Sequence, residues 1–175
     1  MFKIRSIIKP RILVLICTFL LCLSYSPTIF AAGEPGNGLY KIKSVSTGKY
    51  LTLINGEVSL SQTGTIFKVE DTEPSPSVKW FSITYEDKAL SFTNKDATAS
   101  FVDLIPGSLN YGQPNYHEYT CQRFNFGKTR SGYNIKSVAF GNNTDNRLLT
   151  IENGTLCLRK ASGSKDQIFI LEWQY

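Results

Sequence analysis

Histidine is almost absent from this 175-residue chain, and its scarcity limits the chemistry that the chain can perform. His117 is the single histidine, so a metal site built on several imidazoles lacks partners. A cysteine–histidine nucleophile pair would require Cys121 or Cys157 to meet His117. The sequence also lacks a phosphate-binding glycine loop and a dinucleotide fingerprint. We therefore expect no metal, no cofactor and no catalytic residues, and a protein that is not an enzyme.

Long apolar runs are absent after residue 32, although one lies before it. Four basic residues fall within the first eleven positions, an almost unbroken apolar run covers 12–23, and small residues follow at 31–33. This order is typical of a secretory signal peptide, and the apolar run is shorter than the ~20 residues of a comfortable membrane span. We predict a signal peptide at 1–32 and a secreted domain at 33–175 that does not insert into a membrane. An uncleaved signal anchor is the alternative.

A charge excess is also missing once that leader is set aside. The chain has 19 Lys and Arg and 14 Asp and Glu, but four of the basic residues belong to the leader, which leaves 15 against 14. A nucleic-acid-binding or anionic-membrane-binding surface needs concentrated basic charge. We therefore expect no nucleic-acid partner.

Cysteine is scarce after the leader, where only Cys121 and Cys157 remain. In an oxidising compartment the two thiols could form one disulfide, and they could equally stay reduced and buried. The sequence leaves both outcomes open. Asn-x-Thr triplets begin at Asn142 and Asn153, and a secreted chain could carry a glycan at either.

An internal repeat is the strongest positive signal. Each of three copies carries an aromatic start, a leucine step with Asn two residues beyond it, and an aromatic–x–apolar close. The starts are Tyr40, Phe81 and Tyr133; the steps are 51–53, 90–92 and 149–151; the Asn residues are Asn55, Asn94 and Asn153; the closing aromatics are Phe67, Phe124 and Phe169. A period of roughly 40–50 residues marks one structural unit that buries its apolar face against its copies.

Apolar residues alternate with polar ones at a period of two, which predicts strands. Asn-Gly pairs at 55–56 and 153–154 separate strand-like runs and predict type I′ hairpins. No window after the leader predicts an amphipathic helix. With about four short strands per repeat, three repeats at about 38–70, 79–128 and 131–175 would form a six-stranded barrel closed at one end by three hairpins. The three closing phenylalanines would then fill its centre.

This pattern resembles the β-trefoil family and, within it, the ricin-B-type lectins. The resemblance rests on Gly-x-Tyr-x-Ile at 38–42, Gly-Lys-x-Leu-x-Leu at 48–53, and Gln-x-Phe at 122–124 and 167–169. It extends over the whole of 33–175 and implies an all-β trefoil that binds carbohydrate or a glycoprotein. The motifs are short, so they indicate the fold better than the ligand.

The sugar motifs depart from the family pattern. The Asp that accepts hydrogen bonds from sugar hydroxyls in such lectins is replaced by Thr52, Ser91 and Thr150. A hydroxyl bonds more weakly than a carboxylate. Only the third repeat keeps an Asp166–Gln167 pair, so the resemblance implies a sugar site at Thr150, Asn153, Asp166 and Gln167. The alternative is that Asp166 and Gln167 only stabilise a turn.

The second repeat carries an insert at 103–119 that supports a different function. β-Trefoils also include protease inhibitors, which act through exposed loops. The insert holds Tyr111, Tyr116, His117 and Tyr119, and tyrosine-rich loops present rigid amphipathic area to a partner. The same side chains could stack on a sugar, or the insert could have no partner. A secreted carbohydrate-binding β-trefoil is our first interpretation; a protease inhibitor or another protein-binding effector is the alternative.

Overall fold

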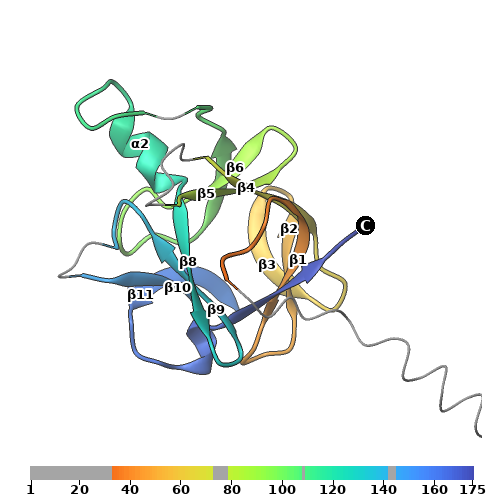
Figure 1. Cartoon of the computed structure of the whole chain (residues 1–175). Helices are drawn as coiled ribbons and strands as arrows, with labels where there is room; N and C mark the ends of the chain where they lie inside the picture. Colours follow the sequence, from red (N-terminus) through yellow and green to blue (C-terminus); the bar gives the residue numbers. More distant parts are fainter. Residues whose placement is uncertain (1–32, 73–78, 108, 142–144) are drawn as a thin grey trace, which may run out of the picture. The chain divides into compact units, whose positions relative to one another are not determined.

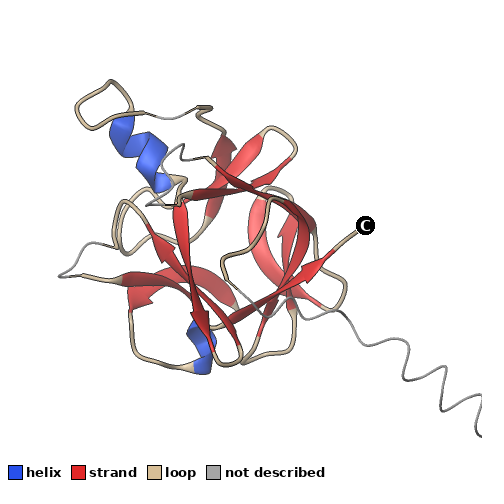
Figure 2. Ribbon diagram, in the orientation of Figure 1, coloured by secondary structure: helices blue, strands red, loops and turns tan. Residues whose placement is uncertain are grey.

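Short antiparallel strands are the main regular structure of the described chain, as the period-two alternation predicts (Figures 1 and 2). The computed structural model of the chain describes residues 33–72, 79–107, 109–141 and 145–175. It divides the chain into two units, Met1–Ala31 and Ala32–Tyr175, and the description below concerns the second. The predicted signal peptide and the acceptor Asn142 lie outside the described residues. In the part that is described, no helix is long and apolar enough to cross a membrane.

Each predicted repeat contains four strands. The first has β1 (Gly38–Ser44), β2 (Tyr50–Ile54), β3 (Glu57–Ser61) and β4 (Ile66–Asp71). The second has β5 (Phe81–Tyr85), β6 (Lys88–Ser91), β7 (Ser100–Asp103), a short helix α2 (Tyr116–Cys121) and β8 (Phe124–Thr129). The third has β9 (Gly132–Ser137), β10 (Arg147–Glu152), β11 (Thr155–Lys160), a 3-10 turn η1 (Lys165–Gln167) and β12 (Phe169–Trp173).

Six of these strands form a closed barrel. Strand β1 pairs with β4, β4 with β5, β5 with β8, β8 with β9, β9 with β12, and β12 returns to β1, all antiparallel. The remaining strands form three hairpins, β2–β3, β6–β7 and β10–β11. This is the predicted arrangement. Closure leaves the barrel without a free edge that could pair with another chain.

The two Asn-Gly hairpins adopt the predicted turn. Asn55 and Gly56 have φ of 52° and 83°, and Asn153 and Gly154 have φ of 52° and 80°. Positive φ at both central residues defines a type I′ turn, whose twist matches that of the strands it joins. The second hairpin has a longer connection at 92–99, in which the backbone N–H of Asp96 donates to Asn94 Oδ1 at 2.9 Å.

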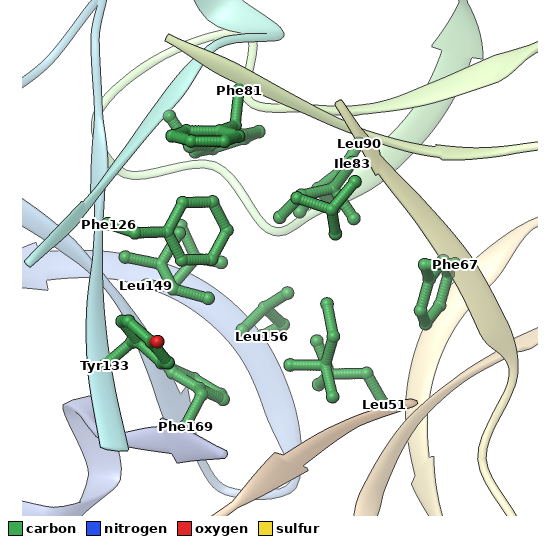
Figure 3. Packing of buried hydrophobic residues seen from close by; sticks show 14 of the residues in the cluster. Leu51, Phe67, Phe81, Ile83, Leu90, Phe126, Tyr133, Leu149, Leu156 and Phe169 are labelled. Carbon is green, nitrogen blue, oxygen red and sulfur yellow. The ribbon is translucent and has the colours of Figure 1, made fainter. Parts of the chain in front are cut away.

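The three repeats share one hydrophobic core (Figure 3). Phe67, Phe124 and Phe169 are all fully buried in it. Phe67 and Phe169 lie on different sides of the cluster, and Leu51 and Leu156 lie between them. The phenylalanines belong to barrel strands and pack inward from the wall, whereas these leucines belong to the hairpins β2–β3 and β10–β11. All three phenylalanines are buried in the core, as predicted, and leucines of the hairpins share its interior with them.

Candidate functional site

Thr150 and Gln167 of the predicted sugar site lie together, but both are buried. Gln167 Nε2 donates to Thr150 Oγ1 at 3.1 Å and to the Lys160 carbonyl at 2.8 Å. Gln167 Oε1 accepts hydrogen bonds from the backbone N–H and the hydroxyl of Ser162, at 2.8 and 3.1 Å. The Thr150 hydroxyl donates to the Leu148 carbonyl at 3.0 Å. Gln167 is 1% exposed and Thr150 8%, so their polar atoms act inside the protein.

The same arrangement occurs in the second repeat. Gln122 Nε2 donates to the Asp103 carbonyl at 2.8 Å, and its Oε1 accepts from the Ile105 N–H at 2.9 Å. In both repeats the glutamine two residues before the closing phenylalanine therefore binds the chain just after the second hairpin strand. The Gln-x-Phe motif fixes where this connection leaves the hairpin.

Asp166 and Asn153 occupy more open positions. The Asp166 carboxylate accepts from the Ser164 hydroxyl at 2.8 Å, and the same hydroxyl caps η1 by accepting from the Asp166 N–H at 3.3 Å. Hydrogen bonds from Ser46 and then from Ser164 lower the pKa of Asp166. Asn153 is exposed at the tip of the β10–β11 hairpin. These two side chains therefore do not converge with Thr150 and Gln167 on one open surface.

An open pocket of about 330 Å³ lies beside this region of the third repeat, and we call it the amide pocket. Three asparagine side chains and one lysine surround an apolar floor. It is lined by Asn125, Phe126, Gly127, Asn134, Lys136, Asn146, Leu148, Ala161 and Gly163. These residues come from β8, β9, the start of β10 and the connection that leads to Asp166 and Gln167. A mixture of neutral donors and acceptors over apolar groups suits small polar ligands.

The amides of the pocket are partly anchored to the backbone. Asn134 Nδ2 donates to the Gln167 carbonyl at 2.7 Å, and Asn125 Nδ2 donates to the Lys79 carbonyl at 2.7 Å. Within the described ranges, the Oδ1 atoms of Asn125 and Asn134 accept no hydrogen bond. The Asn146 side chain makes no hydrogen bond there either. The pocket therefore offers oriented acceptors together with the Lys136 amine.

The amide pocket could not be predicted from local sequence patterns, because its walls come from four separate segments between residues 125 and 163. A signal was present, however. Gly127 stands three residues after Phe124, where the third repeat has Glu172 three residues after Phe169. A small residue at that place in one repeat indicates a hollow that a larger side chain fills in another.

The described residues of the insert at 103–119 are mostly exposed, as predicted, but its end is a helix with a buried tyrosine. Its end forms α2, and Tyr119 is completely buried, with its ring 4.1 Å from the Arg123 guanidinium carbon and 6.3 Å from the Trp80 ring. Tyr116 makes an edge contact with Tyr111 at 5.6 Å. Tyr111 is 91% exposed. Of the four residues proposed for a loop site, Tyr119 is thus unavailable to a partner.

Arg123 is a buried charge that the sequence did not reveal. It is 0% exposed and donates to the Ile105 carbonyl at 2.7 Å and the Gln122 carbonyl at 3.3 Å. Burial lowers its pKa, while contact with Tyr119 opposes the shift. Arg123 therefore holds α2 and the insert against the barrel.

The thiols are unsuited to nucleophilic chemistry. Cys121 Sγ lies 3.7 Å from His117 Nε2, but burial raises the pKa of the thiol to about 11, so it stays protonated at neutral pH. Cys157 is buried as well, and the two cysteines are unpaired, so the disulfide is not formed. Among the described residues, no three His, Cys, Asp or Glu side chains gather as a metal site would require.

Comparisons with known proteins place this architecture among the β-trefoils. No family model matches the chain, and no curated protein matches it. Solved structures do match. They include SeviL with a bound asialo-GM1 saccharide (TM-score 0.57, 15% identity, 79% of this chain and 99% of that one). The agglutinin of Rhizoctonia solani (0.56, 11%, 82% and 100%) and the BEL β-trefoil (0.59, 12%, 84% and 100%) also match.

The described part of the chain is therefore an all-β protein with the β-trefoil fold. Three repeats of four strands, one closed barrel and three hairpins define that class, and the similar structures cover most of the chain. At 11–15% identity these similarities establish the fold alone.

Proposed function

We propose that this protein is a secreted, lectin-like carbohydrate-binding β-trefoil whose sugar site is the amide pocket of the third repeat. One observation carries the proposal: an open pocket of about 330 Å³ offers asparagine side chains and a lysine over an apolar floor. Sugars present hydroxyl groups on an apolar ring, so they match such a lining. The fold is shared with SeviL, which was solved with a saccharide bound.

The proposal places the sugar beside, and not on, the four residues that the family resemblance suggests. Both polar atoms of the Gln167 side-chain amide make hydrogen bonds inside the protein. The Gln167 backbone carbonyl accepts from Asn134 at the pocket wall. Thr150, Asp166 and Gln167 then act as positioning residues for the connection at 161–167. Asn153 remains exposed at the hairpin tip, outside the pocket.

A glycan array probed with residues 33–175 tests the proposal, and we expect binding to a restricted set of glycans. Ala161→Trp should abolish that binding, because an indole at the exposed Ala161 position would occupy the pocket. Thr63→Trp is the matched control, since Thr63 is exposed on the corresponding connection of the first repeat. Absence of binding to every glycan would rule the function out. Equal loss in both variants would place the site elsewhere.

Secretion has its own test. We propose that residues 1–32 direct export and are then removed, on the strength of the basic, apolar and small-residue order of that segment. The mass of the exported protein should correspond to a chain that begins near Gly33. An exported chain that retained its first residues would show that the segment remains as an anchor.

The second candidate function is binding of a protein, including a protease, through the insert. The exposed Tyr111, which makes an edge contact with the Tyr116 ring, favours protein binding. Titration of the domain against serine and cysteine proteases tests the inhibitor, and Tyr111→Ala should weaken any inhibition. Uninhibited cleavage across the panel would rule out the protease inhibitor.

A further inference from the structure

Two lysines occupy equivalent places in the first and third repeats. Lys43 lies opposite Tyr50 where β1 pairs with β2, and Lys136 lies opposite Leu148 where β9 pairs with β10. The residue two positions before each lysine also has an equivalent partner, which lies opposite it on the neighbouring barrel strand. The β1–β12 pairing sets Lys41 opposite Glu172, and the β8–β9 pairing sets Asn134 opposite Gly127. The registers therefore match position by position.

In the first repeat this place is filled and its charge is neutralised. The Tyr50 hydroxyl donates to Glu172 Oε2 at 2.8 Å. Lys43 Nζ lies 3.7 Å from Glu172 Oε1 and 5.1 Å from the centre of the Tyr50 ring. One aromatic ring and one carboxylate thus occupy the space and satisfy the lysine.

In the third repeat both groups are missing, because Leu148 replaces the tyrosine and Gly127 replaces the glutamate. The amide pocket lies at this position. Lys136 forms no ion pair with any residue in the described ranges. The acidic residue beside the pocket-lining Asn146 is Asp145, and Arg147 and Lys160 already contact it at 3.0 and 3.8 Å. Among the residues that the structure describes, the pocket cation Lys136 therefore has no counter-ion.

The Lys136 side chain is also held in place. A Cβ atom added at Gly141 would lie 2.7 Å from both Cγ and Cε of Lys136, so the lysine stem packs against the Gly141 backbone. A stem that is already ordered loses less conformational freedom when its amine binds a ligand.

We propose that the amide pocket takes an anionic sugar, and that the carboxylate or sulfate group of this sugar pairs with Lys136 as Glu172 pairs with Lys43. The asparagine side chains then bind the ring hydroxyls. This inference rests on the proposed carbohydrate-binding function and specifies its ligand class. An ammonium paired with an anion forms a charge-assisted hydrogen bond, which is stronger than a neutral one.

Calorimetric titration of residues 33–175 with galactose, galacturonic acid and galactose 6-sulfate tests the charge requirement. We expect an acidic sugar to bind about tenfold or more tightly than the neutral one, which is the ratio expected for one charged hydrogen bond. The carboxylate and sulfate arms show which anion is preferred. Lys136→Met should remove the preference. Lys43→Met is the matched control and should retain it, because Lys43 already has Glu172 as its partner.

A second variant reproduces the first-repeat arrangement inside the pocket. Gly127→Glu is sterically tolerated, since a Cβ there meets nothing closer than the Asn134 carbonyl at 4.0 Å. The new carboxylate should pair with Lys136 and abolish selection for the acidic sugar, whereas Gly127→Ala should not. Equal affinity for the charged and neutral sugars in the unmodified protein would overturn the anion assignment and leave the lectin proposal standing. Absence of binding to any sugar would overturn both.

Discussion

Two glutamines show how a family motif can serve structure where a sugar contact is expected. Gln122 and Gln167 make the same pair of backbone contacts, to residues 103 and 105 in one case and 160 and 162 in the other. A buried amide satisfied on both sides is costly to remove, because its former partners stay buried without hydrogen bonds. The Gln-x-Phe motif therefore has a structural role in this chain that needs no sugar contact.

Gln167→Ala should destabilise the protein by about 2–3 kcal/mol, since it leaves several buried polar groups unsatisfied. Chemical denaturation of residues 33–175 measures the loss. Gln174→Ala is the control, because the Gln174 side chain donates to the neighbouring Glu172 and Trp173 carbonyls near the C-terminus and its backbone bond to Leu39 would be kept. A surface change of that kind should stay within about 0.5 kcal/mol. Equal effects of the two changes would contradict the anchoring role of Gln167.

Cys121 should make stability depend on alkaline pH. Burial raises its pKa from 9.0 to about 11, so the folded protein holds the thiol proton more tightly than the unfolded chain does. Stability from this group is therefore fully present below pH 9 and is lost as pH rises through about 11. The free energy of unfolding, measured between pH 8 and 11, should fall less steeply in Cys121→Ala than in the unmodified protein.

Tyr40 and Tyr133 also have pKa values raised by burial, so some alkaline loss should remain in that variant. Identical slopes in the two proteins would show that the Cys121 thiol titrates as it does in the unfolded chain. Only the slopes are compared, because removal of a buried sulfur changes the stability at every pH.

Among the structural elements, the Asn-Gly hairpins were predictable from local chemistry alone. Gly56 and Gly154 have φ near +80°, where a side chain is strained. Gly56→Ala and Gly154→Ala should each cost about 1–2 kcal/mol, measured as a lower midpoint of denaturation with an unchanged dependence on denaturant. Gly127→Ala is the control, as Gly127 lies in a β-strand with room for a methyl group. Similar costs at all three glycines would contradict the type I′ turns.

The helix α2 could not be predicted in the same way. It has six residues and no side-chain cap. The residue before it, Asn115, has a left-handed backbone conformation. Its order comes from tertiary contacts of Tyr119 with Trp80 and Arg123, which no local pattern encodes. The amide pocket was missed for a related reason, since strand pairing brings Asn125, Asn134 and Lys136 together with the connection after β11. The repeat in the sequence predicts the fold class, but the pocket becomes apparent only when the strand pairings of the first and third repeats are compared.

At the scale of the whole molecule, we expect the three repeats to unfold as one cooperative unit, because they share one core. Leu51, Leu90 and Leu156 reach one core cluster from three different hairpins (Figure 3). Leu156→Ala should therefore lower the stability of the entire domain by about 2–5 kcal/mol. Far-ultraviolet and aromatic circular dichroism should report a single coincident transition. Separate transitions for the two signals would show that the repeats unfold independently.

Closure of the barrel depends on the last strand of the chain, because β12 joins the third repeat to the first. Five residue pairs connect β12 with β1, and Phe169 also pairs with Tyr133 of β9. A chain that ends at Ile168 would leave β1 and β9 with exposed edges and remove the buried Phe169 from the core. Such edges promote association between chains. We expect this truncated protein to aggregate or remain unfolded, as assayed by size-exclusion chromatography and circular dichroism. Deletion of the fully exposed Tyr175 alone is the control and should leave a folded monomer-sized species. A folded species from the chain that ends at Ile168 would show that the barrel does not require closure.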